Sequence, residues 1–83
     1  MNFGEALDNL KRGLKVARKG WNGKSMWIAM EEPEEDDSMT LPYLYIEYPE
    51  GHPAHPEGCR VPWLASQTDI LAEDWSEVAE EKI

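Results

Sequence analysis

Residues 14–31 read LKVARKGWNGKSMWIAME, two short apolar runs on either side of a turn. The first run, residues 14–18, predicts a strand, and Asn22-Gly23 is a strong signal for a hairpin turn. The second run, residues 25–31, alternates strictly, so successive side chains point to opposite faces of a strand. We expect Trp27 on the face away from the core. The face toward the core carries the two methionines and one isoleucine: Met26, Ile28 and Met30.

The same alternation returns in the second half of the chain. Residues 41–48 predict a strand with Leu44, Ile46 and Tyr48 on one face, and residues 59–64 predict another strand. Residues 49–58, PEGHPAHPEG, contain too many turn formers for a helix or strand. The sequence therefore predicts a hairpin with a long loop over 41–64. The acidic run before it, residues 31–37, is expected to be an extended, solvated connection.

Two helices flank these strands. The first is predicted over residues 3–12, with Asn2 and Glu5 as a capping box and Gly13 just past its end. Its apolar stripe repeats at helical spacing: Phe3, Leu7, Leu10 and Leu14.

The second helix begins with the pattern Ser66-Gln67-Thr68-Asp69, another capping box, and covers Ile70 and Leu71. A last short strand is predicted over 74–78. The order of elements predicts an α+β fold, in which a small antiparallel sheet carries an N-terminal helix and a second short helix. All 83 residues form one domain.

Composition limits the partners of this domain. Its formal net charge is −9, and residues 31–83 hold fifteen of the seventeen acidic side chains. Such a charge argues against a nucleic acid polymer or an anionic membrane as partner. Six of the eight basic side chains lie in residues 1–30, which leaves room for a small anionic ligand. Cys59 is the only cysteine, so no disulfide within the chain supports the core, and self-association is the expected source of stability.

Catalytic and metal-binding patterns are weak. His52, His55 and Cys59 have a spacing that resembles a metal site, but a proline follows each histidine and no second cysteine exists. We expect a structural turn there, with no metal and no cofactor. Ser66 and Asp69 are explained as a helix cap rather than as part of a hydrolase, and no phosphate-binding loop is present. The sequence predicts a protein that is not an enzyme.

Four tryptophans in 83 residues exceed what so small a core buries. We expect Trp75 to be core. Trp21 lies on the turn among basic residues, three positions after Arg18. An aromatic ring beside cations suits a ligand with a flat base and phosphates, because stacking holds the base and the cations hold the anion. Contact with such a ligand and packing in a subunit interface are equally good readings of Trp21.

Four motifs carry a family resemblance: MNFGEAL at 1–7, VARKGWNGK at 16–24, VPWLASQTD at 61–69 and LAEDW at 71–75. Together they resemble the Thoeris anti-defence family of the second type, small proteins of phages and prophages. The resemblance covers about residues 1–30 and 59–78. Residues 31–58 match nothing in the pattern and read as a variable, loop-rich insertion.

The resemblance implies a molecular sponge. Such proteins sequester a cyclic ADP-ribose-type signal made by bacterial TIR-domain immune proteins, some also take up cyclic dinucleotides, and they do not cleave the ligand. It also implies a homotetramer, with pockets between subunits, in the cytoplasm of the bacterial host. The site residues that it implies lie in two of the motifs: Arg18, Trp21, Asn22, Trp63, Ser66, Thr68 and Asp69.

In that pocket Trp21 would stack on the base, Asn22 would hydrogen-bond the base or ribose, and Arg18 would meet phosphate. Asp69 would accept hydrogen bonds from ribose hydroxyls. Two other classes of function stay open. One is an acidic decoy that binds a host nucleic-acid-binding protein through its negative surface. The other is a structural assembly module in which the tryptophans form the interface.

Overall fold

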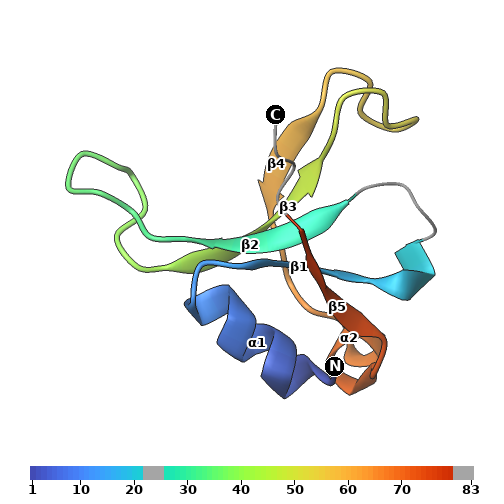
Figure 1. Cartoon of the computed structure of the whole chain (residues 1–83). Coiled ribbons are helices and arrows are strands. Elements are labelled where there is room, and N and C mark those ends of the chain that lie inside the picture. The colour runs from blue at the N-terminus through green and yellow to red at the C-terminus, as the bar shows by residue number, and fades with distance from the viewer. Residues whose placement is uncertain (22–25, 80–83) are drawn as a thin grey trace.

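The sheet has the strand order β4-β3-β2-β1-β5, and every neighbouring pair is antiparallel. The structure is a computed structural model that describes residues 1–21 and 26–79. Figure 1 shows both helices on one side of this sheet, which confirms the α+β prediction. The elements are α1 (Phe3–Lys11), β1 (Lys15–Arg18), the 3₁₀ turn η1 (Lys19–Trp21), β2 (Trp27–Glu31), β3 (Tyr43–Tyr48), β4 (Cys59–Pro62), α2 (Gln67–Leu71) and β5 (Trp75–Val78).

The predicted β1–β2 pairing is confirmed, and its register places Val16 opposite Ile28. Both side chains are fully buried. Met26 and Met30 pack against the same core, so the methionine face of β2 is the core face, as the alternation predicts. The Asn22-Gly23 turn lies outside the described residues. The segment before it, Lys19–Trp21, forms a single 3₁₀ turn that follows β1 directly.

The β3–β4 hairpin is also confirmed, with both strands shorter than predicted. Its loop turns at Gly51 and Gly58, which have φ values of 87° and 75°. A Cβ at Gly58 would lie 3.0 Å from the Tyr48 carbonyl oxygen, so only glycine fits the loop at that point.

The acidic segment differs from the expectation of an extended chain. Its backbone reverses in a tight turn, in which the Asp37 amide donates to the Glu34 carbonyl over 3.0 Å. The Glu34 amide donates in return to the Asp37 carboxylate over 2.7 Å. These two hydrogen bonds close the turn locally and offset the repulsion between neighbouring carboxylates.

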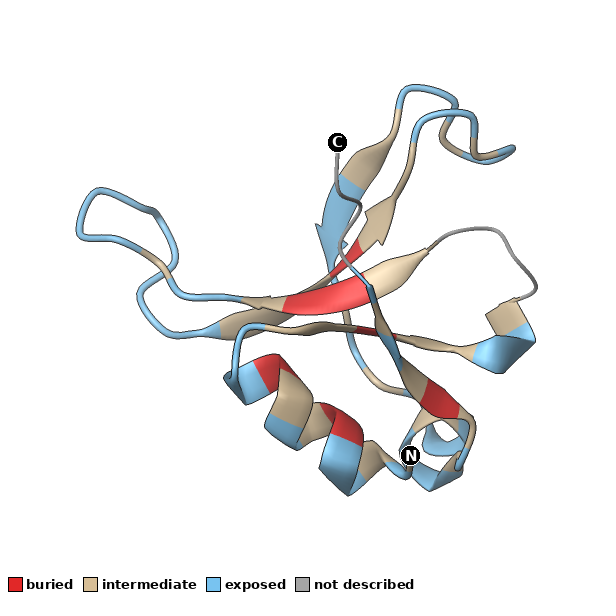
Figure 2. Cartoon of the chain, in the orientation of Figure 1, coloured by how far each residue is buried: buried red, intermediate tan, exposed pale blue. Residues whose placement is uncertain are grey.

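The capping boxes of both helices are present as predicted. In α1 the Glu5 amide donates to the Asn2 side chain, and Gly13 follows the helix with a φ of 85°. α1 packs on β1, β2 and β5. The core that results is small, and Figure 2 shows its few buried positions between α1 and the sheet. It consists of Ala6, Leu10, Val16, Ile28, Ile46 and Trp75.

β5 adds to the free edge of β1 rather than to the β3–β4 hairpin. The register pairs Arg18 with Trp75 at one end and Lys15 with Val78 at the other. This places the end of β1 and the start of β5 side by side, although 57 positions separate Arg18 from Trp75. In the described part of the chain no helix is long and apolar enough to cross a membrane.

Candidate functional site

Arg18 joins three elements at the end of β1. Its Nε donates to Asp74 Oδ1 and its Nη1 donates to Asp69 Oδ1, both over 3.0 Å. Asp69 lies in α2, and Asp74 lies just before β5. The hydrogen bonds to Asp74 and Asp69 raise the pKa of Arg18. The fork of the guanidinium therefore holds α2 and the start of β5 against the sheet.

Both carboxylates stay ionised in this arrangement. The hydrogen bond from Arg18 lowers the pKa of Asp74, and the Gly20 amide adds to the effect. Burial alone would raise the pKa of Asp69. The hydrogen bonds from the Ser66 amide and hydroxyl and from Arg18 outweigh burial and lower it. The centre of the network is thus one cation between two anions.

Asp74 also anchors the turn that carries Trp21. Its Oδ2 accepts from the Gly20 amide over 3.3 Å, and its backbone carbonyl accepts from the Lys19 amide over 3.1 Å. Sequence reasoning missed Asp74 as a site residue. The available signal was the aspartate directly before Trp75, but the β1–β5 pairing that gives Asp74 a role depends on contacts far apart in the sequence.

Four aromatic side chains, here called the tryptophan cluster, gather beside this network: Phe3, Trp21, Trp63 and Trp75. Trp75 is the centre and is only 1% exposed, which confirms it as core. Its ring centroid lies 5.7 Å from that of Trp21 and 6.0 Å from that of Trp63, both edge to face. Its indole Nε1–H donates to the Asp69 carbonyl over 3.0 Å. Trp21 and Trp63 are half-buried, so each presents part of a ring at the surface.

The α2 cap supplies the polar part of the site. The Ser66 and Thr68 hydroxyl oxygens lie 2.9 Å apart, and both residues are exposed. The Ser66 hydroxyl also donates to Asp69 Oδ2 over 2.8 Å. The carboxylate of Asp69 is therefore engaged on both oxygens, by Arg18 on one and Ser66 on the other.

Six of the seven predicted site residues thus belong to one neighbourhood. Arg18 contacts Asp69 directly, Ser66 and Thr68 cap the same helix, and Trp21 and Trp63 flank Trp75 from two sides. Asn22 lies outside the described residues. That these side chains contact a ligand stays a prediction, but the fold brings the two motifs together as one site requires.

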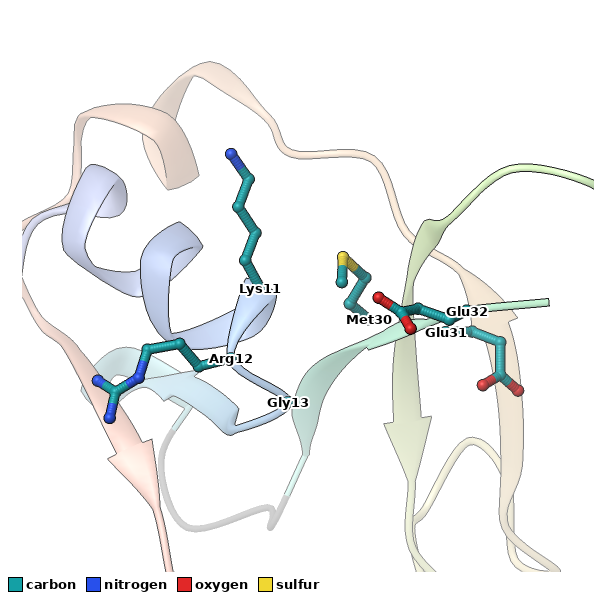
Figure 3. A pocket seen from close by; sticks show the side chains of 6 residues that line it. All are labelled: Lys11, Arg12, Gly13, Met30, Glu31 and Glu32. Atoms are coloured by element: carbon teal, nitrogen blue, oxygen red, sulfur yellow. The ribbon is translucent and has the colours of Figure 1, made fainter.

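A separate hollow of about 360 Å³ lies between the end of α1 and the end of β2. No predicted site residue lines it. Figure 3 shows its side chains spread apart, with Arg12 pointing away from the glutamates of β2 and the segment after it. The hollow therefore lacks a set of polar groups aimed at one point. Its lining residues are Lys11, Arg12, Gly13, Met30, Glu31 and Glu32.

The two histidines of the 49–58 loop pack on Tyr48, with ring centroids 5.0 Å and 4.5 Å away. His52 Nδ1 accepts a hydrogen bond from the Ala54 amide over 3.1 Å. In residues 1–21 and 26–79, no three side chains of histidine, cysteine, aspartate or glutamate converge as a metal site. Packing on Tyr48 gives both histidines a structural role in the loop.

Comparison with known proteins assigns nearly the whole chain to the family that the four sequence motifs resemble. The family model of the Thoeris anti-defense 2-like domain matches residues 1–78. A relative named "Thoeris anti-defense 2", from Bacillus phage SP01, is 35% identical over 94 aligned positions, which cover 95% of this chain and 96% of the relative. The match includes residues 31–58, which the sequence pattern alone leaves unassigned. The chain therefore belongs to the Thoeris anti-defense 2-like family.

Proposed function

We propose that this protein is a phage anti-defence sponge that acts against the Thoeris system in the bacterial cytoplasm. It binds a cyclic nucleotide immune signal of the cyclic ADP-ribose type, with cyclic dinucleotides as a second ligand class, and holds it without cleaving it. Family membership supports the anti-Thoeris role. The observation that carries the binding role is the tryptophan cluster beside exposed hydroxyls and cations.

The aromatic rings and the hydroxyl groups recognise different parts of the ligand. The exposed parts of Trp21 and Trp63 stack on a flat base, and stacking on one aromatic is worth about 1–3 kcal/mol. The hydroxyls of Ser66 and Thr68 hydrogen-bond ribose. Asp69 and Asp74 offset the charge of Arg18, so Arg18 mainly positions the site and offers its remaining N–H groups to phosphate. Lys19, exposed on the same turn, adds a cation.

The chemistry of the α2 cap supports binding over catalysis. A serine nucleophile needs a base to take its proton. The Ser66 hydroxyl donates to Asp69, a carboxylate with a lowered pKa and a tight ion pair to Arg18. Such a carboxylate is a poor base near neutral pH. Ser66 therefore caps the helix, and the bound signal leaves intact.

A second copy of the chain completes the site. α2 and the segment before it carry three exposed apolar side chains, called the α2 patch: Leu64 at 91%, Ile70 at 44% and Leu71 at 75% exposure. The patch lies next to the tryptophan cluster along the chain, and a small core gains most from covering it. We infer that two copies pack through this patch, enclose the ligand between them, and assemble further into a homotetramer.

Equilibrium dialysis tests the binding role directly. The protein is dialysed against cyclic ADP-ribose, a cyclic dinucleotide and linear ADP-ribose in parallel. Retention of a cyclic compound over the linear one supports the proposal. No retention, or equal retention of the linear compound, contradicts it. An acidic decoy predicts instead no retention and a salt-sensitive complex with a basic host protein.

A further inference from the structure

Asp74 holds the turn that carries Trp21. The regular pairing of β1 with β5 ends just before this turn. Beyond the last pair, the Lys19 amide donates to the Asp74 carbonyl over 3.1 Å, and the Gly20 amide donates to Asp74 Oδ2 over 3.3 Å. The next residue in the chain is Trp21. Because η1 is only three residues long, these two hydrogen bonds have a strong influence on where its backbone lies.

The carboxylate of Asp74 is also part of a chain of hydrogen bonds that crosses the candidate site. Its Oδ2 accepts from the Gly20 amide, and its Oδ1 accepts from Arg18 Nε over 3.0 Å. Arg18 Nη1 donates to Asp69 Oδ1 over 3.0 Å, and Asp69 Oδ2 accepts from the Ser66 hydroxyl over 2.8 Å. Asp74 therefore connects the η1 turn, through Arg18, to the cap of α2.

The ring of Trp21 has another anchor in the core. It meets the ring of Trp75 edge to face, with centroids 5.7 Å apart. Trp75 is itself fixed, because its Nε1–H donates to the Asp69 carbonyl over 3.0 Å. An edge contact still allows the Trp21 ring to tilt about its own side-chain bonds. The direction of its exposed surface therefore depends on the position of the backbone in the turn.

We propose that Asp74 is a positioning residue of the ligand site. It fixes the η1 turn so that the exposed part of Trp21 has a set place relative to the hydroxyls of Ser66 and Thr68. The inference rests on the proposed function, since it concerns the affinity of the same site. A site that is ordered before binding loses less conformational freedom when the ligand arrives, and its affinity is higher for that reason.

Asp74→Asn tests the proposal with almost no change in the size of the side chain. The amide has one oxygen, which accepts from either Arg18 or the Gly20 amide. Its NH₂ group then faces the other N–H donor, so one of the two hydrogen bonds is lost whichever way the amide is turned. Glu73→Gln is the matched control, because it removes the same charge from the neighbouring residue, which is exposed.

Equilibrium dialysis gives the affinity for cyclic ADP-ribose, while circular dichroism and light scattering verify folding and assembly mass. We expect Asp74→Asn to raise the dissociation constant about 3- to 10-fold and Glu73→Gln to leave it unchanged. In a Trp21→Ala background, Asp74→Asn should cause little further loss, because the side chain that Asp74 positions is absent. A residue that only stabilises the fold would instead give additive losses.

Hydrogen exchange examines the turn without any ligand. We expect the Gly20 amide of the wild type to exchange at least about tenfold more slowly than a glycine amide in an unfolded peptide. Asp74→Asn should remove this protection, and Glu73→Gln should keep it. An unprotected Gly20 amide in the wild type overturns the proposal even if Asp74→Asn fails to fold.

Dialysis also separates this proposal from the sponge. If the wild type binds cyclic ADP-ribose and a folded Asp74→Asn protein binds it equally well, only the positioning role is overturned. Additive losses in the double variant with Trp21→Ala have the same meaning. If the wild type retains no cyclic nucleotide, the sponge itself is overturned, and the ligand role of Asp74 falls with it.

Discussion

Arg18 is the residue on which the position of α2 and the η1 turn depends. Arg18→Ala leaves Asp69 and Asp74 as two carboxylates without their shared cation. Because all three side chains are partly exposed, we expect a loss of about 1–2 kcal/mol in the free energy of unfolding. Arg60→Ala is the matched control, since its side chain is 58% exposed and its single ion pair is worth about 1 kcal/mol or less. If urea unfolding showed that both variants lose the same free energy of unfolding, the role of Arg18 would be contradicted.

The same network gives stability a dependence on pH. Asp69 and Asp74 have lowered pKa values in the folded chain, so the folded state binds fewer protons than the unfolded state. Their contribution is present above the ordinary aspartate pKa of about 4 and is lost as the pH falls through the folded-state values. We expect the urea concentration at the midpoint of unfolding to decrease as the pH is lowered below about 5. The decrease should be less steep for Asp74→Asn. Identical pH profiles for the variant and the wild type would refute this.

Trp21 is the residue on which we expect the affinity for the ligand to depend most. Trp21→Ala removes one stacking surface, and we expect the dissociation constant for cyclic ADP-ribose to rise about five- to a hundredfold. Trp21→Phe keeps a smaller ring and should recover part of the affinity. Because Trp21 also packs on Trp75, assembly mass is measured on the same samples. Full affinity in an assembled Trp21→Ala protein would remove the stacking role.

At the scale of elements, the sequence predicted those features that depend on residues close together in the chain. Both capping boxes, the methionine face of β2 and the two hairpins follow from spacing and turn residues. The place of β5 beside β1 does not, because it depends on contacts between residues more than fifty positions apart. For the same reason the sequence pointed to Arg18 and Asp69 separately, and left out Asp74, which joins them to the η1 turn.

The apolar side chains of α2 are exposed rather than buried in the core, and we propose that they serve an interface. No residue of α2 is fully buried. In an isolated chain Leu64→Ser and Leu71→Ser would change stability by about 0.5 kcal/mol or less. In the assembly we expect the double variant to lose both mass and ligand retention. Leu41→Ser is the matched control, because Leu41 is 75% exposed in the loop before β3. A double variant with wild-type mass and retention would exclude the α2 patch as the interface.

At the scale of the whole molecule, the buried core is small, and some apolar side chains remain on a surface that is otherwise acidic. Six of the described residues form the buried cluster, while the α2 patch leaves apolar side chains exposed. Acidic side chains keep most of the remaining surface soluble and repulsive. We therefore propose that copies of the chain associate where the surface is apolar, as it is at the α2 patch.

We expect the protein to capture its ligand without cleaving it, and release of the ligand from denatured protein tests this most directly. The protein is incubated with the cyclic ADP-ribose-type signal, freed of unbound ligand and denatured by heat, and the supernatant is analysed by mass spectrometry. We expect the signal to be recovered intact and in proportion to the protein, and a Trp21→Ala sample to yield far less. Recovery of a cleaved product, or of no nucleotide from the wild type, would contradict the sponge.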